Sequence, residues 1–93
     1  MAAISGQKTV TTAGTAVALG AGRVDGPLSV KALDTNTGVV ALGNDGANDI
    51  TVSNGLRLAP GEVIIFEYLG DLASIFLDSA INGEGVSWLA LNG

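Results

Sequence analysis

The chain has 93 residues, with nine acidic residues, four basic residues and a net charge of −5. This charge opposes binding to nucleic acid or to an anionic membrane surface, because both need clustered Lys and Arg. The absence of Cys and His excludes disulfides, Ser-His-Asp or cysteine-histidine catalysis, and the usual zinc ligands.

The chain is unusually apolar for a protein without a membrane-spanning segment. Hydrophobic residues make up 47% of it and charged residues 14%, whereas a soluble domain usually carries about 25% charged residues. Its longest apolar runs, such as Val63–Phe66, have strand length and fall far short of the roughly 20 residues of a membrane helix. The excess therefore predicts apolar surface that is buried against other protein, which would also stabilise so short a chain.

Short runs rich in Val, Ile, Leu and Thr alternate with glycine-containing turns, and their side-chain period is two. This pattern predicts an all-β fold: a small antiparallel β-sandwich or jelly-roll-like domain of about eight short strands. We assign residues 1–6 to a short N-terminal arm and residues 7–93 to a single sandwich domain without a convincing helix. The strands are expected at Lys8–Thr12, Thr15–Leu19, Leu28–Asp34, Val39–Gly43, Ile50–Ser53, Glu62–Tyr68, Ser74–Asp78 and Val86–Leu91, with Leu56–Leu58 as a further short candidate.

The alternation also sorts side chains between the two faces of each strand. Glu67 marks the outer face of its strand, and Val63 and Ile65 share that face. In the same way, Lys31 assigns Leu33 to an outer face, and Asp78 marks a solvent-facing side of its strand that Phe76 shares. A cluster of apolar side chains on outer faces usually marks a partner surface. The alternative is that both faces are covered within one sandwich or by a long loop. The predicted interface residues are Ile4, Leu33, Val63, Ile65 and Phe76.

Patterns that would indicate an enzyme are weak. The nearest carboxylate pairs, Asp45 with Asp49 and Glu62 with Glu67, resemble a glycosidase pair only in residue type, and nine acids on a short chain produce such pairs by chance. Gly20–Gly22 lacks the following helix and Lys of a phosphate-binding loop. We therefore predict no catalytic site and no cofactor.

A polar segment, Gly43–Thr51, is the one candidate metal site. The side-chain oxygens of Asp45, Asn48 and Asp49 are of the type that binds Ca²⁺. The alternative is an Asx-rich loop, in which these side chains accept hydrogen bonds from their own backbone.

Three stretches follow one another along the chain in this order: Asn36–Gly46, Asn54–Glu62, and Leu77–Asp78 leading into Asn82–Leu89. Together they resemble small structural proteins of tailed bacteriophages, in which an NTG-V hairpin precedes an NG-x-x-L-x-x-GE segment and a terminal D-x-x-x-NGEGV strand. The resemblance covers roughly residues 28–91. It implies a virion component that decorates or cements the capsid, often as a trimer between capsid subunits, and it brings no catalytic residues.

The sequence thus predicts a non-enzymatic structural protein, made in the host cytoplasm without a secretory signal and placed on the outer capsid surface. Its expected partners are the major capsid protein and further copies of itself, as a homotrimer or another homo-oligomer, with residues 1–6 adding a strand to a neighbour. The alternative is a carbohydrate- or receptor-binding module of a tail or fibre. Exposed aromatic residues would favour that alternative, but Trp88 is better explained as a core or subunit-interface anchor.

Overall fold

The computed structural model describes residues 2–44, 55–67 and 70–92, and these residues are almost entirely β-structure. All strand pairs among them are antiparallel. The elements are β1 (Ala2–Thr9), β2 (Val17–Ala18), β3 (Arg23–Val24), β4 (Pro27–Ala32), β5 (Val40–Gly43), β6 (Leu56–Leu58), β7 (Val63–Glu67), β8 (Gly70–Asp71), the 3₁₀ turn η1 (Leu72–Ser74), β9 (Phe76–Ser79) and β10 (Gly85–Asn92).

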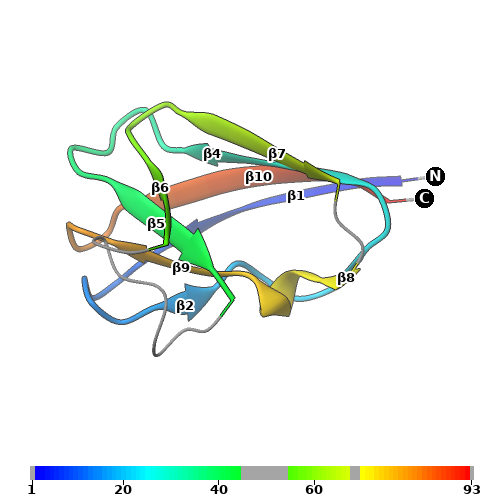
Figure 1. Ribbon diagram of the computed structural model, residues 1–93, viewed down its shortest axis with the longest axis horizontal. Helices are drawn as coiled ribbons and strands as arrows, with labels where there is room; N and C mark the ends of the chain where they lie inside the picture. The colour runs from blue at the N-terminus through cyan, green and yellow to red at the C-terminus, as the bar shows by residue number, and fades with distance from the viewer. Residues whose placement is uncertain (1, 45–54, 68–69, 93) are drawn as a thin grey trace.

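The strands form two four-stranded sheets that pack face to face (Figure 1). The first sheet has the order β1-β10-β4-β7, and the second has the order β2-β9-β5-β6. The short strands β3 and β8 pair with each other at one end. The predicted fold class, a small all-β antiparallel sandwich, is confirmed.

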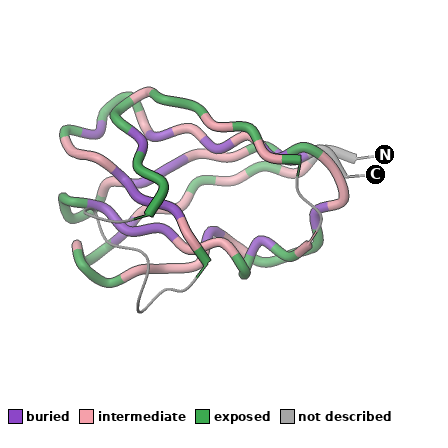
Figure 2. Tube along the Cα trace, in the orientation of Figure 1, coloured by how far each residue is buried: buried purple, intermediate pink, exposed green. Residues whose placement is uncertain are grey.

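The core lies between the two sheets and is built by the predicted alternation. In β4, Leu28, Val30 and Ala32 are fully buried, whereas Ser29 and Lys31 between them are not (Figure 2). Leu42 and Leu77 face them from the second sheet. Complete burial of each such Leu or Val side chain contributes on the order of 2 kcal/mol to stability. The other buried members of the core are Val10, Leu19, Val24, Val40, Leu58, Leu72, Val86 and Ala90.

The predicted N-terminal arm is part of the sheet. Residues 2–9 pair with residues 85–92 in an unbroken register from Ala2 with Asn92 to Thr9 with Gly85. Ile4 packs against the core from this strand. Pairing within the chain satisfies backbone groups that an arm would leave to water, so residues 2–6 are not a separate arm in this structure. The two ends of the chain consequently lie side by side (Figure 1).

Two short strands and one helical turn were missed. Arg23 pairs with Asp71 and Val24 with Gly70, and so short a contact between segments far apart in the sequence leaves no periodic signal. The turn η1 follows directly, and its first N–H groups are capped because the Asp71 carboxylate accepts a hydrogen bond from the Ala73 N–H at 2.8 Å. The expected strand Ile50–Ser53 lies outside the described residues.

The charge of Asp78 does not mark a solvated face. Asp78 lies on the side of β9 that points away from the core, yet only 2% of it is exposed. Its carboxylate accepts hydrogen bonds from the Gly14 N–H at 2.9 Å and the Ser79 N–H at 2.8 Å. A loop from the N-terminal half therefore covers a position that the sequence pattern assigns to solvent.

Asn36 holds the start of β10 in place. Its side-chain amide donates to the carbonyl of Gly85 at 2.9 Å, and its side-chain oxygen accepts from the Gly85 N–H at 3.3 Å. Asn36 is 6% exposed, so these hydrogen bonds form where water does not compete. On the other side of the strand, a Cβ built on Gly85 would overlap the carbonyl oxygen of Lys8 and lie 2.6 Å from the Thr9 Cα. Only glycine allows β1 to approach β10 this closely.

Glu84, the residue before β10, binds the neighbouring turn. Its carboxylate accepts hydrogen bonds from the Thr37 N–H at 2.7 Å, the Thr37 hydroxyl at 3.0 Å and the Gly38 N–H at 3.0 Å. Partial desolvation by itself raises the pKa of the Glu84 carboxyl, but these hydrogen bonds outweigh it and hold the pKa below its ordinary value. The ionised carboxylate is therefore the form that joins the turn at residues 34–38 to β10.

We expect Gly85→Ala to reduce the free energy of unfolding by about 2 kcal/mol or more, because the new methyl group meets backbone atoms of β1 that cannot rotate away. The measurement is urea denaturation followed by circular dichroism. Gly20→Ala is the matched control, since a Cβ there makes ordinary contacts of 3.4 Å with Trp88 and 3.5 Å with Leu72. Equal stability of the two variants would contradict the close approach of β1.

We expect Glu84→Gln to lower stability at neutral pH and to flatten its decrease in acid. A depressed carboxyl pKa contributes stability that is present above the unfolded pKa, about 4.3, and is lost as the pH falls through the folded pKa. Thermal unfolding between pH 7 and pH 3 measures both effects. Glu67→Gln is the control, because the Glu67 side chain is exposed and makes no hydrogen bond within the described residues; the same flattening in both variants would disprove the assignment to Glu84.

Candidate interaction surface

The most unusual surface is the outer face of the first sheet, the side of β1, β10, β4 and β7 that points away from the second sheet. Residues paired across strands share a face, so the register defines its membership. Ser29 pairs with both Leu89 and Ile65, and Lys31 pairs with both Ser87 and Val63. The described side chains of the outer face are those of Ser5, Gln7, Thr9, Pro27, Ser29, Lys31, Val63, Ile65, Glu67, Ser87 and Leu89.

Three large aliphatic side chains are exposed on this face. Ile65 is 67% exposed, Val63 53% and Leu89 49%, and they include the two most exposed large hydrophobic residues of the described chain. Both Val63 and Ile65 lie on β7, at one edge of the sheet, and Leu89 lies on β10. Single exposed apolar residues are common on proteins, but a group on one face is typical of a partner surface.

The residues between these side chains are small and polar. Ser29 separates Leu89 from Ile65 in one row across the sheet, and Ser87 lies beside Lys31 in the next row. A shallow hollow of about 140 Å³ results, lined by Ser29, Lys31, Ser87, Trp88 and Leu89. The face therefore combines projecting aliphatic groups with a depression, which is the relief that a complementary protein surface would fit.

The five predicted interface residues lie on different faces of the structure. Val63 and Ile65 lie on the outer face, as their spacing from Glu67 predicts. Ile4 points inward and packs against the core, so it does not belong to this face. Leu33, just beyond β4, and Phe76, on the outer side of the second sheet, are each half-buried. An interface role for any of them remains a prediction.

The sequence pattern does not identify Leu89 as an outer-face residue, because apolar residues occupy both sets of alternating positions in Trp88–Leu91. A usable signal was nevertheless present. Ser87 has the same parity as Leu89, and a polar residue at the start of a strand marks the outer face in the way that Glu67 does for β7. The buried residues Val86 and Ala90 have the opposite parity.

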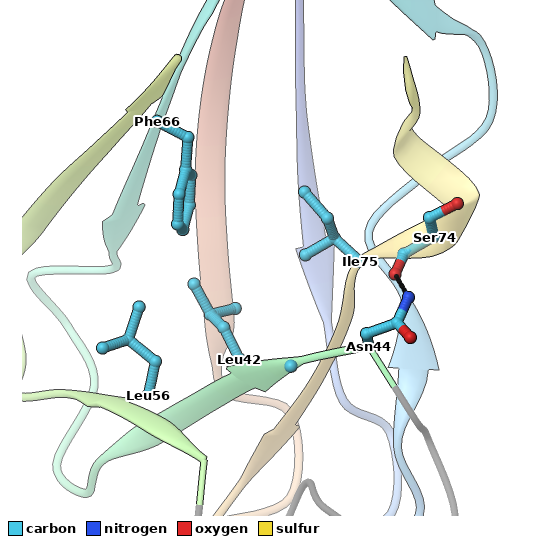
Figure 3. A pocket seen from close by; sticks show the side chains of 7 residues that line it. Leu42, Asn44, Leu56, Phe66, Ser74 and Ile75 are labelled. Carbon is cyan, nitrogen blue, oxygen red and sulfur yellow. Dashed lines mark hydrogen bonds between the residues drawn. The ribbon is translucent and has the colours of Figure 1, made fainter. Parts of the chain in front are cut away.

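A second feature is a pocket of about 310 Å³ between the sheets (Figure 3). Phe66 lies on one side of it, Leu42 and Leu56 on another, and Ile75 closes a third (Figure 3). Asn44 contributes the polar edge, where its side-chain amide donates to the Ser74 carbonyl at 2.8 Å. Gly43 completes the described lining, in which Ser74 carries the one hydroxyl group and no side chain is a carboxylate, an amine or an imidazole. The pocket suits an apolar group, and this lining offers no side chain that could act as an acid or a base.

The calcium candidates Asp45, Asn48 and Asp49 lie outside the described residues. Within the described ranges, no three acidic side chains lie together in a way that could hold a metal ion. No described helix is long and apolar enough to cross a membrane.

The Trp88 side chain packs against the core and does not belong to the outer face of the first sheet. A Cβ built on Gly6 would lie 2.8 Å from Trp88 Cζ2, and one built on Gly20 would lie 3.4 Å from the same atom. The indole therefore lies against two glycines, and Trp88 is one of the half-buried side chains that pack against the core. This agrees with the first of the two expected roles of Trp88, a core anchor, and the role of a subunit-interface anchor stays a prediction.

No protein-family model, curated protein or solved structure that was compared with the chain matches it.

We expect Ile65→Thr to change the free energy of unfolding by less than about 0.5 kcal/mol, because an exposed side chain loses few contacts. Leu28→Ala, on the opposite side of the same sheet, is expected to cost about 2–5 kcal/mol because it leaves a cavity in the core. Urea denaturation of both variants measures the difference. A large loss in the Ile65 variant would show that this side chain is covered within the chain.

Proposed function

We propose that this chain is a non-enzymatic structural protein of a tailed-bacteriophage particle, a decoration or cement protein on the outer surface of the head. Its outer face binds at the junction of major capsid subunits. The observation that carries the proposal is the group of exposed aliphatic side chains Val63, Ile65 and Leu89 on one face of the first sheet. The order of the phage-like stretches in the sequence supports the particle as the site of action.

The energetics of such a role follow from copy number. Burying the still exposed part of each aliphatic side chain is worth on the order of 1 kcal/mol, so one copy binds modestly. Many copies that bind only the assembled shell stabilise it together, because a ligand of one state shifts the equilibrium toward that state. The net charge of −5 suits the outside of a head filled with DNA.

The alternative function, a carbohydrate- or receptor-binding module, has less support. Its best aromatic candidate, Trp88, packs against Gly6 and Gly20 instead of presenting its ring on the outer face. Among the described residues, the outer face holds no aromatic side chain, whereas sugar recognition commonly stacks the ring of the sugar on an exposed aromatic ring.

The test is co-sedimentation with purified heads of the phage whose genome encodes the chain. We expect Leu89→Glu to weaken binding at least about ten-fold, because it places a charge in the centre of the apolar contact. Ile81→Glu is the matched control: Ile81 is also a large aliphatic residue, 44% exposed, but lies in the turn before β10 and away from the outer face. Failure of the unaltered chain to sediment with heads would overturn the proposal, and equal loss in both variants would exclude the outer face as the contact.

A further inference from the structure

The first sheet has two edges, and at the β7 edge backbone groups point away from the sheet toward a side where no described strand lies. The Ala32 N–H donates to the Glu62 carbonyl at 2.9 Å and the Ala32 carbonyl accepts from the Gly61 N–H at 3.1 Å, so the backbone groups of Ala32 point toward the β7 side at the start of the β4–β7 ladder. In an antiparallel ladder hydrogen-bonded pairs alternate with non-hydrogen-bonded ones, and Ile64 and Phe66 therefore also bond to β4. The N–H and C=O groups of Val63, Ile65 and Glu67 point to the opposite side, where no described strand pairs with β7.

The β1 edge and the β7 edge of the first sheet differ in how well they are protected against pairing with another chain. Proteins commonly prevent edge-to-edge association with an inward-pointing charge, a Lys or a Pro on the edge strand. The β1 edge has such a residue, since Lys8 pairs with buried Val86 and therefore lies on the inward side of the sheet. The β7 edge has no Lys or Pro between Val63 and Glu67, and its outer face carries the most exposed aliphatic side chain of the described chain, Ile65.

We propose that β7 pairs with β7 of a second copy of this chain, antiparallel and about a two-fold axis at Ile65. The pairing joins two four-stranded sheets into one sheet of eight strands. This inference names the surface and symmetry of self-association, and it does not depend on the capsid as partner. A two-fold axis uses the same patch on both copies, which is the commonest arrangement of soluble homo-oligomers.

The charges at this edge favour a second copy in the antiparallel orientation. With Ile65 facing Ile65, each Val63 lies opposite Glu67 of the other copy, and the two Glu67 side chains are kept at opposite ends. A parallel arrangement would place the Glu67 carboxylates side by side, which is destabilising. Lys31 pairs with Val63 in its own sheet, so it lies in the same cross-sheet row as Glu67 of the second copy. Opposite charges thus flank the apolar centre on both sides of the axis.

The existing ion pair of Lys31 does not prevent this arrangement. Its Nζ lies 3.2 Å from an Asp34 carboxylate oxygen, and both side chains are substantially exposed. An exposed pair of this kind contributes little free energy, so the ammonium group can turn toward a carboxylate of the second copy. Because the two-fold axis is perpendicular to the sheet, both outer faces remain on the same side. The row Leu89–Ser29–Ile65 then continues into Ile65–Ser29–Leu89 of the second copy, which doubles the length of the apolar row.

The test is analytical ultracentrifugation of the unaltered chain and of two proline variants. We expect the chain to reach twice its 9.2 kDa mass at high concentration. Ile65→Pro removes an N–H that points away from β4, so it spares the internal ladder but weakens self-association at least about ten-fold. Gln7→Pro is the matched control on the other edge. Its N–H also points outward, because the Val10 N–H to Glu84 carbonyl bond of 2.9 Å fixes the alternation along β1.

A monomer at every concentration would overturn the proposal, and so would equal weakening by Ile65→Pro and Gln7→Pro. If circular dichroism shows that Ile65→Pro is unfolded, Ile65→Lys replaces it, because two ammonium groups at the axis repel each other while the exposed position tolerates the change. The head-binding experiment uses the Leu89 variant, and Leu89 does not lie on the β7 edge, so head binding and self-association are tested separately. A monomer that still binds heads would overturn the pairing alone, and a dimer that does not bind heads would overturn only the function.

Discussion

The double hydrogen bond between the Asn36 side chain and the backbone of Gly85 is the contact on which one end of the sandwich depends. It joins the turn after β4 to the first residue of β10, the strand that pairs with both β1 and β4. The Leu33 N–H also donates to the Gly85 carbonyl, at 3.1 Å, and the Val10 N–H donates to the carbonyl of the preceding residue, Glu84, at 2.9 Å. Three segments that are far apart in sequence therefore meet at two consecutive residues. Loss of this junction would loosen the registers of both ladders of β10.

The chain has few charged residues, and the polar side chains that it buries form hydrogen bonds within the fold. Asn36, Asp78 and Ser79 are buried, and within the described residues every buried side-chain nitrogen or oxygen has a hydrogen-bond partner. These partners are backbone groups, namely those of the strand residues Gly85 and Ser79 and of the turn residues Gly14 and Ile81. The polar side chains thus replace missing secondary-structure bonds in a chain with many short strands. On the outer face of the first sheet, the charged side chains among the described residues are Lys31 and Glu67.

What the sequence predicts well is local alternation, and what it predicts poorly is pairing between distant segments. The faces of β4 and β7 were predicted correctly because the polar residues Ser29, Lys31 and Glu67 mark the outer parity of each strand, although Val63 and Ile65 share that parity in β7. Residues 2–6 gave no strand signal, since Ala, Gly and Ser have low strand propensity and their position is fixed by the register with β10. Asp78 was assigned to solvent because the loop that covers it, at Gly14, is 64 residues away. The same limit applies to the candidate surface. Alternation within one strand predicts that Val63 and Ile65 share a face, but only the order of the strands in the sheet shows that Leu89 lies on that face too.

The pairing of Ala2 with Asn92 has a topological consequence. Because the ends of the described chain are neighbours in one ladder, a short linker between them would close the backbone into a ring without moving any strand. Closure would remove conformations from the unfolded chain while leaving the folded one unchanged. Such a ring could then be reopened in the exposed loop around Thr11 and Thr12, which would make β10 and β1 a continuous hairpin at the C-terminal end of the permuted protein. The order of strands along the chain is in this sense a separate property from their order in space.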